Sequence, residues 1–345
     1  MIDCCTLEKY CNFIMKNYNL NPLKSNGLIN GKMGYAIFLY EASRYFNNKE
    51  YEKMAEKVLE EVIMNPPQTQ LNMSTGLSGI GVGMLYLIQN KYCNVSSTFF
   101  EELDNIIYKE IIDKEKSNEN LLFDILFYYA QKDDPLLKGK RNILELEVLT
   151  RLVNQVCSIL PIYTVNLRKD TCFDLYDRTY YTVATLLDLQ QKEFCKEKII
   201  RTFVEFVEIA TSLIPKMHFN RLNLAITLSH VNVLLKNKFV SKHIDMLLGS
   251  IETDQLIAEL DENRFLYFRK GLVGQIAFLK GIQNEDIIKN RLGYTVDECL
   301  QYAYRILNEK IPNVEKYVTA IGADTSLCGC SGFALLCMKY PLHIN

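Results

Sequence analysis

The chain of 345 residues contains no tryptophan. Because tryptophan is a usual platform on which proteins stack sugar rings, its absence argues against a carbohydrate-active enzyme. The chain also lacks an excess of basic residues, since 39 Lys and Arg stand against 41 Asp and Glu, and general nucleic-acid binding is therefore not expected. No run of about 18 uncharged apolar residues occurs, which excludes the usual membrane-spanning helix.

Several targeting and catalytic signals are missing as well. The N-terminal residues Met1–Thr6 lack the basic head and apolar core of a signal peptide. The chain has no phosphate-binding loop, no dinucleotide-binding glycine motif after a strand and no Ser-His-Asp or Cys-His elbow. Eleven cysteines without regular spacing are typical of reduced thiols. These absences predict a soluble, cytoplasmic protein.

A short glycine pattern, Gly-x-x-Gly, recurs at the head of apolar segments. Its four copies begin at Gly31, Gly76, Gly271 and Gly329. Each copy is followed by an apolar run rich in small residues, which predicts a buried helix. Glycine at a helix head allows two backbones to approach closely. The recurrence predicts a repeat architecture.

Three further copies, which lack the glycines, fit between the second and third glycine heads: Leu121–Ala130, Cys172–Leu187 and Phe219–Leu228. The repeats then begin near positions 31, 76, 128, 179, 222, 271 and 329. Amphipathic helices are predicted between them, at Tyr51–Ile63, Phe99–Ile112, Leu144–Leu160, Phe194–Ile214, Ser241–Ile251 and Val296–Ile311. The prolines that we expect between helices are Pro66, Pro67, Pro135, Pro161 and Pro312.

This order of apolar and amphipathic helices predicts one all-α domain over residues 1–345. Its expected architecture is an α/α toroid of about seven helical hairpins, with apolar inner helices and amphipathic outer ones. The alternative is an open solenoid, which needs a polar cap at each end. The last repeat, at Gly329, is strongly apolar, and it therefore favours the toroid.

The glycine heads, their period and the number of repeats resemble the lanthionine synthetase C-like (LanC-like) family. The resemblance covers nearly the whole chain and is strongest at Gly27–Gly34, Ser74–Gly81 and Lys270–Leu279. It implies a toroid whose inner-helix heads face a central cavity. Cyclases of the family add a peptide cysteine thiolate to dehydroalanine or dehydrobutyrine. The resemblance also implies a zinc ion, held by two cysteines and one histidine, with a fourth position open to the substrate thiol.

The positions that match the three zinc ligands carry Asn220, Arg269 and Lys270. A guanidinium is not a zinc ligand, and a protonated lysine has no lone pair to offer. The resemblance therefore predicts that the zinc site is lost and that no cofactor is needed. Two other family positions give the candidate catalytic residues. The family's aspartate of the third repeat matches Asp124, and its histidine of the fourth repeat falls at Arg178, which stays protonated and cannot act as acid or base.

Basic side chains gather at the predicted helix heads: Lys32, Arg178, Arg221, Arg269 and Lys270. Helix N-termini favour anions. One hypothesis is therefore a cationic cavity, to which Asn220 also belongs, that binds a carboxylate-rich or phosphorylated peptide. The alternative is a solvated rim on which these charges pair with nearby acids, the candidates being Asp124, Asp174, Asp177 and Glu262.

Cys328 and Cys330 form a Cys-x-Cys motif, which suggests a second place for zinc, with His218, His230 or His343 as a further ligand. The alternative is that both thiols pack as small residues at a helix start, because buried free cysteine is common.

The function that this sequence predicts is a LanC-like component of lanthipeptide-type biosynthesis that lacks zinc. Its expected partners are a peptide substrate or leader peptide, and a dehydratase or other maturation enzyme. One alternative is an active cyclase in which Arg269 or Lys270 stabilises the thiolate and Asp124 positions a proton donor. Another is a toroid hydrolase that uses carboxylates such as Asp124 and Asp174, because glycoside cleavage needs two carboxyl groups.

Overall fold

The computed structural model describes residues 4–66, 70–94, 97–113, 119–132, 143–165, 172–311, 318 and 324–340. Within these ranges the regular secondary structure is helical and contains no strand, which confirms the all-α fold class. The chain divides into two compact units. Unit 1 consists of residues 1–138, 264–268 and 304–345, and unit 2 of residues 139–263 and 269–303. The single domain over residues 1–345 stays a prediction.

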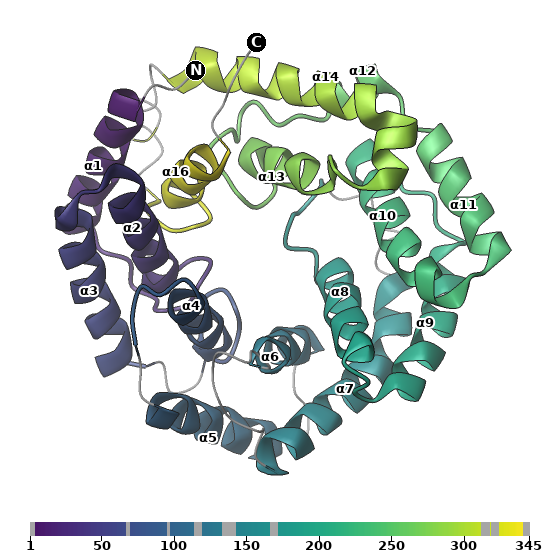
Figure 1. Ribbon diagram of the computed structural model, residues 1–345, viewed down its shortest axis with the longest axis horizontal. Coiled ribbons are helices and arrows are strands. Elements are labelled where there is room, and N and C mark those ends of the chain that lie inside the picture. Colours follow the sequence, from purple (N-terminus) through teal and green to yellow (C-terminus); the bar gives the residue numbers. More distant parts are fainter. Residues whose placement is uncertain are drawn as a thin grey trace. The chain divides into compact units, whose positions relative to one another are not determined.

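Unit 1 is built from two layers of helices (Figure 1). The apolar helices lie side by side in the order α16, α2, α4 and α6, while α3 packs along α2, α1 packs against α16, and α5 packs against α4. Their bounds are α1 (Cys4–Leu20), α2 (Lys32–Phe46), α3 (Lys49–Met64), α4 (Leu77–Gln89), α5 (Ser97–Asp113), α6 (Glu119–Gln131) and α16 (Cys330–Lys339). The arrangement is the predicted alternation of apolar and amphipathic helices.

The two layers follow from the residue pattern of each helix. Helix α3 buries only one stripe, at Tyr51, Ala55, Val58, Leu59 and Val62, and exposes most of its charged residues on the opposite face. Helix α4 is buried around nearly its whole circumference and contains no charged residue. A helix that is apolar all round belongs between other helices, so α4 lies in the inner layer of the unit.

The second glycine of the repeated pattern lies where a loop carbonyl crosses the helix. A Cβ atom on Gly79 would lie 2.0 Å from the carbonyl oxygen of Met73, and one on Gly34 would lie 2.0 Å from that of Leu28. No side chain fits at that distance, so only glycine allows the loop to pass over the first turn of the helix. The close approach that the sequence predicts at the helix heads is confirmed at these two repeats.

The loops that precede these helices are joined by backbone hydrogen bonds. The amide of Phe268 donates to Cys328 (2.9 Å), that of Cys328 donates to Ile29 (3.0 Å), and that of Leu28 donates to Met73 (3.2 Å). These bonds link the last repeat directly to the first, and α16 packs beside α2. Within unit 1 the last repeat is therefore a direct neighbour of the first.

Unit 2 repeats the pairing of apolar and amphipathic helices. Helix α8 lies beside α10, while α7 and α9 pack against α8 and α11 packs against α10. The bounds are α7 (Ile143–Thr164), α8 (Arg178–Gln191), α9 (Lys196–Ala210), α10 (His218–Leu235), α11 (Lys238–Gly249), α12 (Thr253–Ala258), α13 (Leu272–Ile282) and α14 (Asp286–Lys310), whose last residues belong to unit 1.

Some helix ends differ from the prediction. Helix α7 continues through Pro161 to Thr164, whereas we expected a helix end there. Pro161 lies in the last turn, so the helix loses only the bond to the carbonyl of Cys157, and the Thr164 hydroxyl donates to Leu160 at 2.7 Å. Helices α1 and α12 were not predicted. Three of the prolines fall outside the described residues: Pro67, Pro135 and Pro312.

Among the helices of the described residues, none has both the length and the apolar composition that crossing a lipid bilayer requires.

Candidate functional site at the heads of helices α10 and α13

A pocket of about 490 Å³ lies in unit 2, at the N-terminal ends of α10 and α13. The chemistry-bearing residues of its lining are Cys172, Glu259, Asp261, Glu262, Lys270 and Gln275. The pocket thus contains Lys270, which the sequence placed at the head of the sixth repeat. We take this pocket as the candidate functional site.

One lining residue of this site, Phe173, belongs to an aromatic cluster. The ring of Phe173 lies 5.3 Å from that of Phe219 and 4.9 Å from that of Phe278, centroid to centroid. Phe173 precedes α8, while the other two rings come from α10 and α13. All three residues are buried. The cluster therefore fixes the loop before α8 against the two helices whose N-termini open into the pocket.

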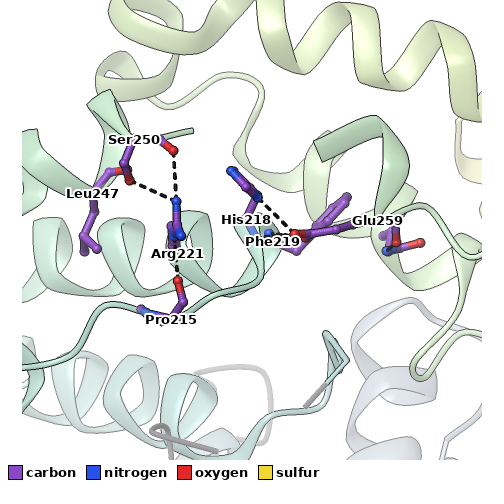
Figure 2. A network of polar contacts seen from close by, with 8 residues as sticks. Pro215, His218, Phe219, Arg221, Leu247, Ser250 and Glu259 are labelled. Carbon is purple, nitrogen blue, oxygen red and sulfur yellow. Dashed lines mark hydrogen bonds and ion pairs between the residues drawn. The ribbon is translucent and has the colours of Figure 1, made fainter. Parts of the chain in front are cut away.

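The N-terminus of α10 is already occupied by a side chain of the same unit. Both carboxylate oxygens of Glu259 accept backbone hydrogen bonds, one from His218 at 2.6 Å and one from Phe219 at 2.9 Å (Figure 2). The His218 ring nitrogen Nδ1 lies 3.0 Å from the first of these oxygens. Glu259 therefore satisfies amides that would otherwise attract an external anion.

Arg221, one turn further along α10, points away from the pocket. Its Nε donates to the carbonyl oxygen of Pro215 at 2.5 Å, and its Nη1 donates to that of Ser250 at 3.0 Å (Figure 2). The guanidinium therefore ties the start of α10 to the end of α11. These bonds give Arg221 a structural role, and its anion-binding role stays a prediction.

Arg269 binds an acid of its own unit. Its Nε donates to Asp174 Oδ1 at 3.1 Å, and its Nη2 donates to the other oxygen of the same carboxylate. The guanidinium carbon also lies 5.3 Å from the centroid of the Tyr176 ring. A bidentate pair of this kind fixes the plane of the guanidinium. Arg269 thus follows the alternative in which a helix-head cation pairs with one of the predicted acids.

Lys270 differs from the two arginines. Its backbone is left-handed, with φ of 48°, and its side chain lines the pocket. Within the described part of the chain, its ammonium has no hydrogen-bond or ion-pair partner. Lys270 is therefore available to a ligand in the pocket.

Acidic residues outnumber basic ones in the lining of this pocket, and the cationic cavity at the helix heads stays a prediction. Three carboxylates line it, from Glu259, Asp261 and Glu262, against the single ammonium of Lys270. Gln275 holds two of these acidic residues in place, since its Oε1 accepts from the amide of Asp261 at 3.0 Å and its Nε2 donates to the carbonyl of Glu259 at 2.8 Å. The pocket is acidic, and it does not suit the anionic peptide that the cationic-cavity hypothesis expects there.

Arg178, a candidate catalytic residue, begins α8. Its guanidinium carbon lies 5.5 Å from the centroid of the Tyr176 ring. The preceding residue, Asp177, caps the helix, because its Oδ1 accepts from the amide of Thr179 at 2.9 Å. Burial raises the pKa of Asp177 above the usual aspartate value. Asn220, the third residue of α10, is half-buried.

The two predicted site residues of unit 1 have internal partners. The ammonium of Lys32 lies 2.8 Å from Glu61 Oε2. Asp124 is fully buried, and its Oδ2 accepts from the amide of Met73 at 2.9 Å. Asp124 thus supports the loop whose carbonyl crosses Gly79.

The first three repeats are similar to a known protein family. Residues 22–130 match the family model for Lanthionine synthetase C-like protein. This segment, about a third of the chain, is therefore similar to LanC-like proteins. It includes the glycine heads of α2 and α4 and ends just after Asp124. No curated protein matches the chain.

The resemblance to LanC-like proteins implies a zinc centre, and its three ligand positions lie in unit 2. Asn220, Arg269 and Lys270 offer an amide, a guanidinium and an ammonium, and the guanidinium is already bound by Asp174. Zinc in proteins prefers thiolate, imidazole and carboxylate donors. These three side chains therefore do not fit a zinc ion.

The Cys-x-Cys motif of the last repeat lies at the start of α16. Cys330 is buried, and its surroundings raise the pKa of its thiol to about 11, mainly through desolvation. Cys328 is half-buried. Among the described residues of this unit, no group of three possible metal ligands includes the pair. His343 lies outside the described residues. The burial of Cys330 agrees with a packing role for that thiol.

Sequence reasoning missed the residues that organise the pocket of unit 2. Glu259 caps a helix that begins 41 residues earlier in the chain, and Gln275 lies in a helix that the pattern marks only as apolar. No local sequence motif indicates either contact. The one available signal was the absence of a Ser, Thr, Asp or Asn cap before α10, which starts after Met217.

Proposed function

We propose that this protein is a LanC-like component of ribosomal modified-peptide biosynthesis that binds peptide without a zinc centre. The LanC-like segment at residues 22–130 supports the peptide-modification context. The partner would be a peptide substrate or leader peptide, or a maturation enzyme such as a dehydratase that carries one.

One observation carries the zinc-free part of the proposal. At the head of the sixth repeat, where the family resemblance calls for metal ligands, Arg269 is held by both oxygens of Asp174. A cation fixed there repels a second cation. The nearby Lys270 and Asn220 add no donor that zinc prefers.

The first alternative is an active cyclase, and one observation favours it. Lys270 lies without a partner among the described residues in a pocket whose lining also includes Cys172. An ammonium without a partner can stabilise the thiolate of a bound substrate. The hydrolase alternative has no such support, because Asp124 and Asp174 both have structural partners.

The test uses a dehydrated peptide with one cysteine and a fluorescent label. We expect the purified protein to bind it, as measured by fluorescence anisotropy, without loss of the alkylatable thiol. Added zinc or a chelator should change neither result. Thioether closure that disappears in Lys270→Gln would establish the cyclase instead. One equivalent of tightly bound zinc in the purified protein would contradict the zinc-free proposal.

A further inference from the structure

A second pocket, in unit 1, lies between the end of α1, the loop that follows it and one face of α3. Its volume is about 530 Å³. Three lysines and one glutamate line it, at Lys24, Lys32, Lys57 and Glu61. We call it the Lys24 pocket. Its formal charge is positive, in contrast to the acidic pocket of unit 2.

Among the described residues, only one of the three lysines is neutralised by an acid. Lys32 forms the ion pair with Glu61, at 2.8 Å. Lys24 and Lys57 are exposed, and among the described residues neither has a hydrogen-bond or ion-pair partner. Two ammonium groups of the same pocket therefore remain available to an anion.

A buried hydroxyl provides an independent indication of a ligand. Tyr18 lines the pocket, is 3% exposed and stacks on Tyr35 with the ring centroids 4.1 Å apart. Its hydroxyl has no hydrogen-bond partner within the described residues. Burial, together with the charge of Glu61, raises the pKa of Tyr18 well above its ordinary value, so the group stays a proton donor. A buried donor without a partner costs free energy unless a ligand accepts its hydrogen bond.

The rest of the lining indicates what kind of anion fits. Pro22, Leu23 and Met54 give the pocket an apolar wall, which a small inorganic anion would not use. No arginine lines it to supply the planar fork that suits phosphate. The first amides of α2 do not contribute, because that of Lys32 donates to the carbonyl of Ser25 at 2.9 Å. The lining suits a carboxylate that has an apolar group beside it.

We propose that the Lys24 pocket binds an acidic segment of a peptide. Lys24 and Lys57 hold a carboxylate, and an adjoining apolar side chain lies against Leu23 and Met54. This inference rests on the proposed function, because it names the chemistry of the bound peptide and the place that holds it. The acidic peptide that the sequence suggested for the helix heads is thereby assigned to the only one of the two pockets whose charge suits it.

The test uses the full chain and a short labelled peptide of aspartate and leucine, followed by fluorescence anisotropy at low salt. The double variant Lys24→Gln/Lys57→Gln should bind it about tenfold more weakly or worse, because two charged hydrogen-bond donors are lost. The matched control is Lys16→Gln/Lys53→Gln, which removes two exposed lysines of α1 and α3 that do not line the pocket. The control should bind as the wild type does.

Tyr18→Phe removes only the hydroxyl and keeps the stacked ring. We expect about threefold weaker peptide binding or more, from the loss of one hydrogen bond, with no loss of thermal stability. Unchanged binding in this variant would overturn the role of Tyr18, and with it the independent support for the site.

Three further outcomes would overturn the inference. The first is equal binding of the same peptide with asparagine in place of aspartate. The second is an equal loss of affinity in the two double variants. The third is displacement of the labelled peptide by inorganic phosphate at a concentration similar to that of the unlabelled peptide. The dehydrated peptide of the functional test separates the two proposals. If the wild type binds the dehydrated peptide, but Lys24→Gln/Lys57→Gln binds the peptide of aspartate and leucine as well as the wild type does, only the Lys24 pocket fails. If the wild type binds neither peptide, the proposed function fails as well.

Discussion

The two units hold the starts of their inner helices in place with different chemical groups. In unit 1 the loops before the inner helices are joined by backbone hydrogen bonds, such as the one from Cys328 to Ile29, and glycines let the chains approach. In unit 2, side chains hold the helix starts. Glu259 caps α10, Asp177 caps α8, and Arg221 on α10 donates to the carbonyls of Pro215 and Ser250. The α8 and α10 repeats, which lack the glycine head, are thus held by side-chain contacts, both local and distant in the sequence.

The largest expected effect is at a glycine of unit 1. Gly79→Ala places a Cβ 2.0 Å from the carbonyl oxygen of Met73, and we expect a loss of about 3 kcal/mol or more in the free energy of unfolding, because the loop must move. Urea unfolding followed by circular dichroism measures it.

The matched control is Gly281→Ala, near the end of α13, where a Cβ would meet no atom within 4 Å. We expect this variant to be more stable by about 0.5–1 kcal/mol, because alanine is the better helix former. Equal effects in the two variants would refute the claim that close approach explains the glycine heads.

An intermediate effect is expected at the cap of α10. In Glu259→Gln the amide side chain can accept from only one of the two backbone amides and turns an NH₂ group toward the other, so we expect a loss of about 1–3 kcal/mol. Glu252→Gln makes the same charge change at an exposed residue and should be nearly neutral. If both variants unfold at the same urea concentration, unit 2 does not depend on this side-chain cap.

The smallest effect concerns His243, a third side-chain contact of unit 2. Its Nε2 lies 3.1 Å from the carbonyl oxygen of Leu213, and burial lowers its pKa below the ordinary 6.5. The unfolded chain therefore takes up a proton that the folded chain does not, so stability should fall as the pH drops through 6.5.

The slope should stay below about 1.4 kcal/mol per pH unit, the limit for a single proton. Urea unfolding at pH 7.5 and pH 5.5 should show a smaller fall in His243→Gln than in the wild type. His230→Gln, at an exposed position, should keep the wild-type fall. A wild-type slope in His243→Gln would assign the pH dependence to other groups.

Much of the fold follows from the sequence. The apolar runs after Gly31 and Gly76 became α2 and α4, and the stripe over Tyr51–Ile63 became one face of α3. The degenerate copies at Leu121–Ala130 and Phe219–Leu228 lie within α6 and α10. These predictions succeed because periodicity and glycine spacing are local properties. Helix ends were predicted less well. Helix α7 continues through Pro161 because a proline in the last turn removes only one backbone hydrogen bond, which packing offsets.

The candidate site could be predicted only in part. The sequence placed Lys270 at a helix head, and the structure places it in a pocket. It could not tell that Arg269 binds Asp174, which lies 95 residues away. Nor could it tell that, among the described residues, the Tyr18 hydroxyl has no hydrogen-bond partner and lines a pocket with two unpaired lysines. The charge of a pocket depends on which acids the tertiary structure brings to it, and local spacing does not specify them.

The amino-acid sequence by itself determined the helical repeats and the places where only glycine fits, because both depend on residues within a few turns of one another. The tertiary structure alone decided which cations are neutralised and which remain available. An ion pair forms only between side chains that the completed fold brings within about 4 Å, so equal charges at equivalent helix heads end in different roles.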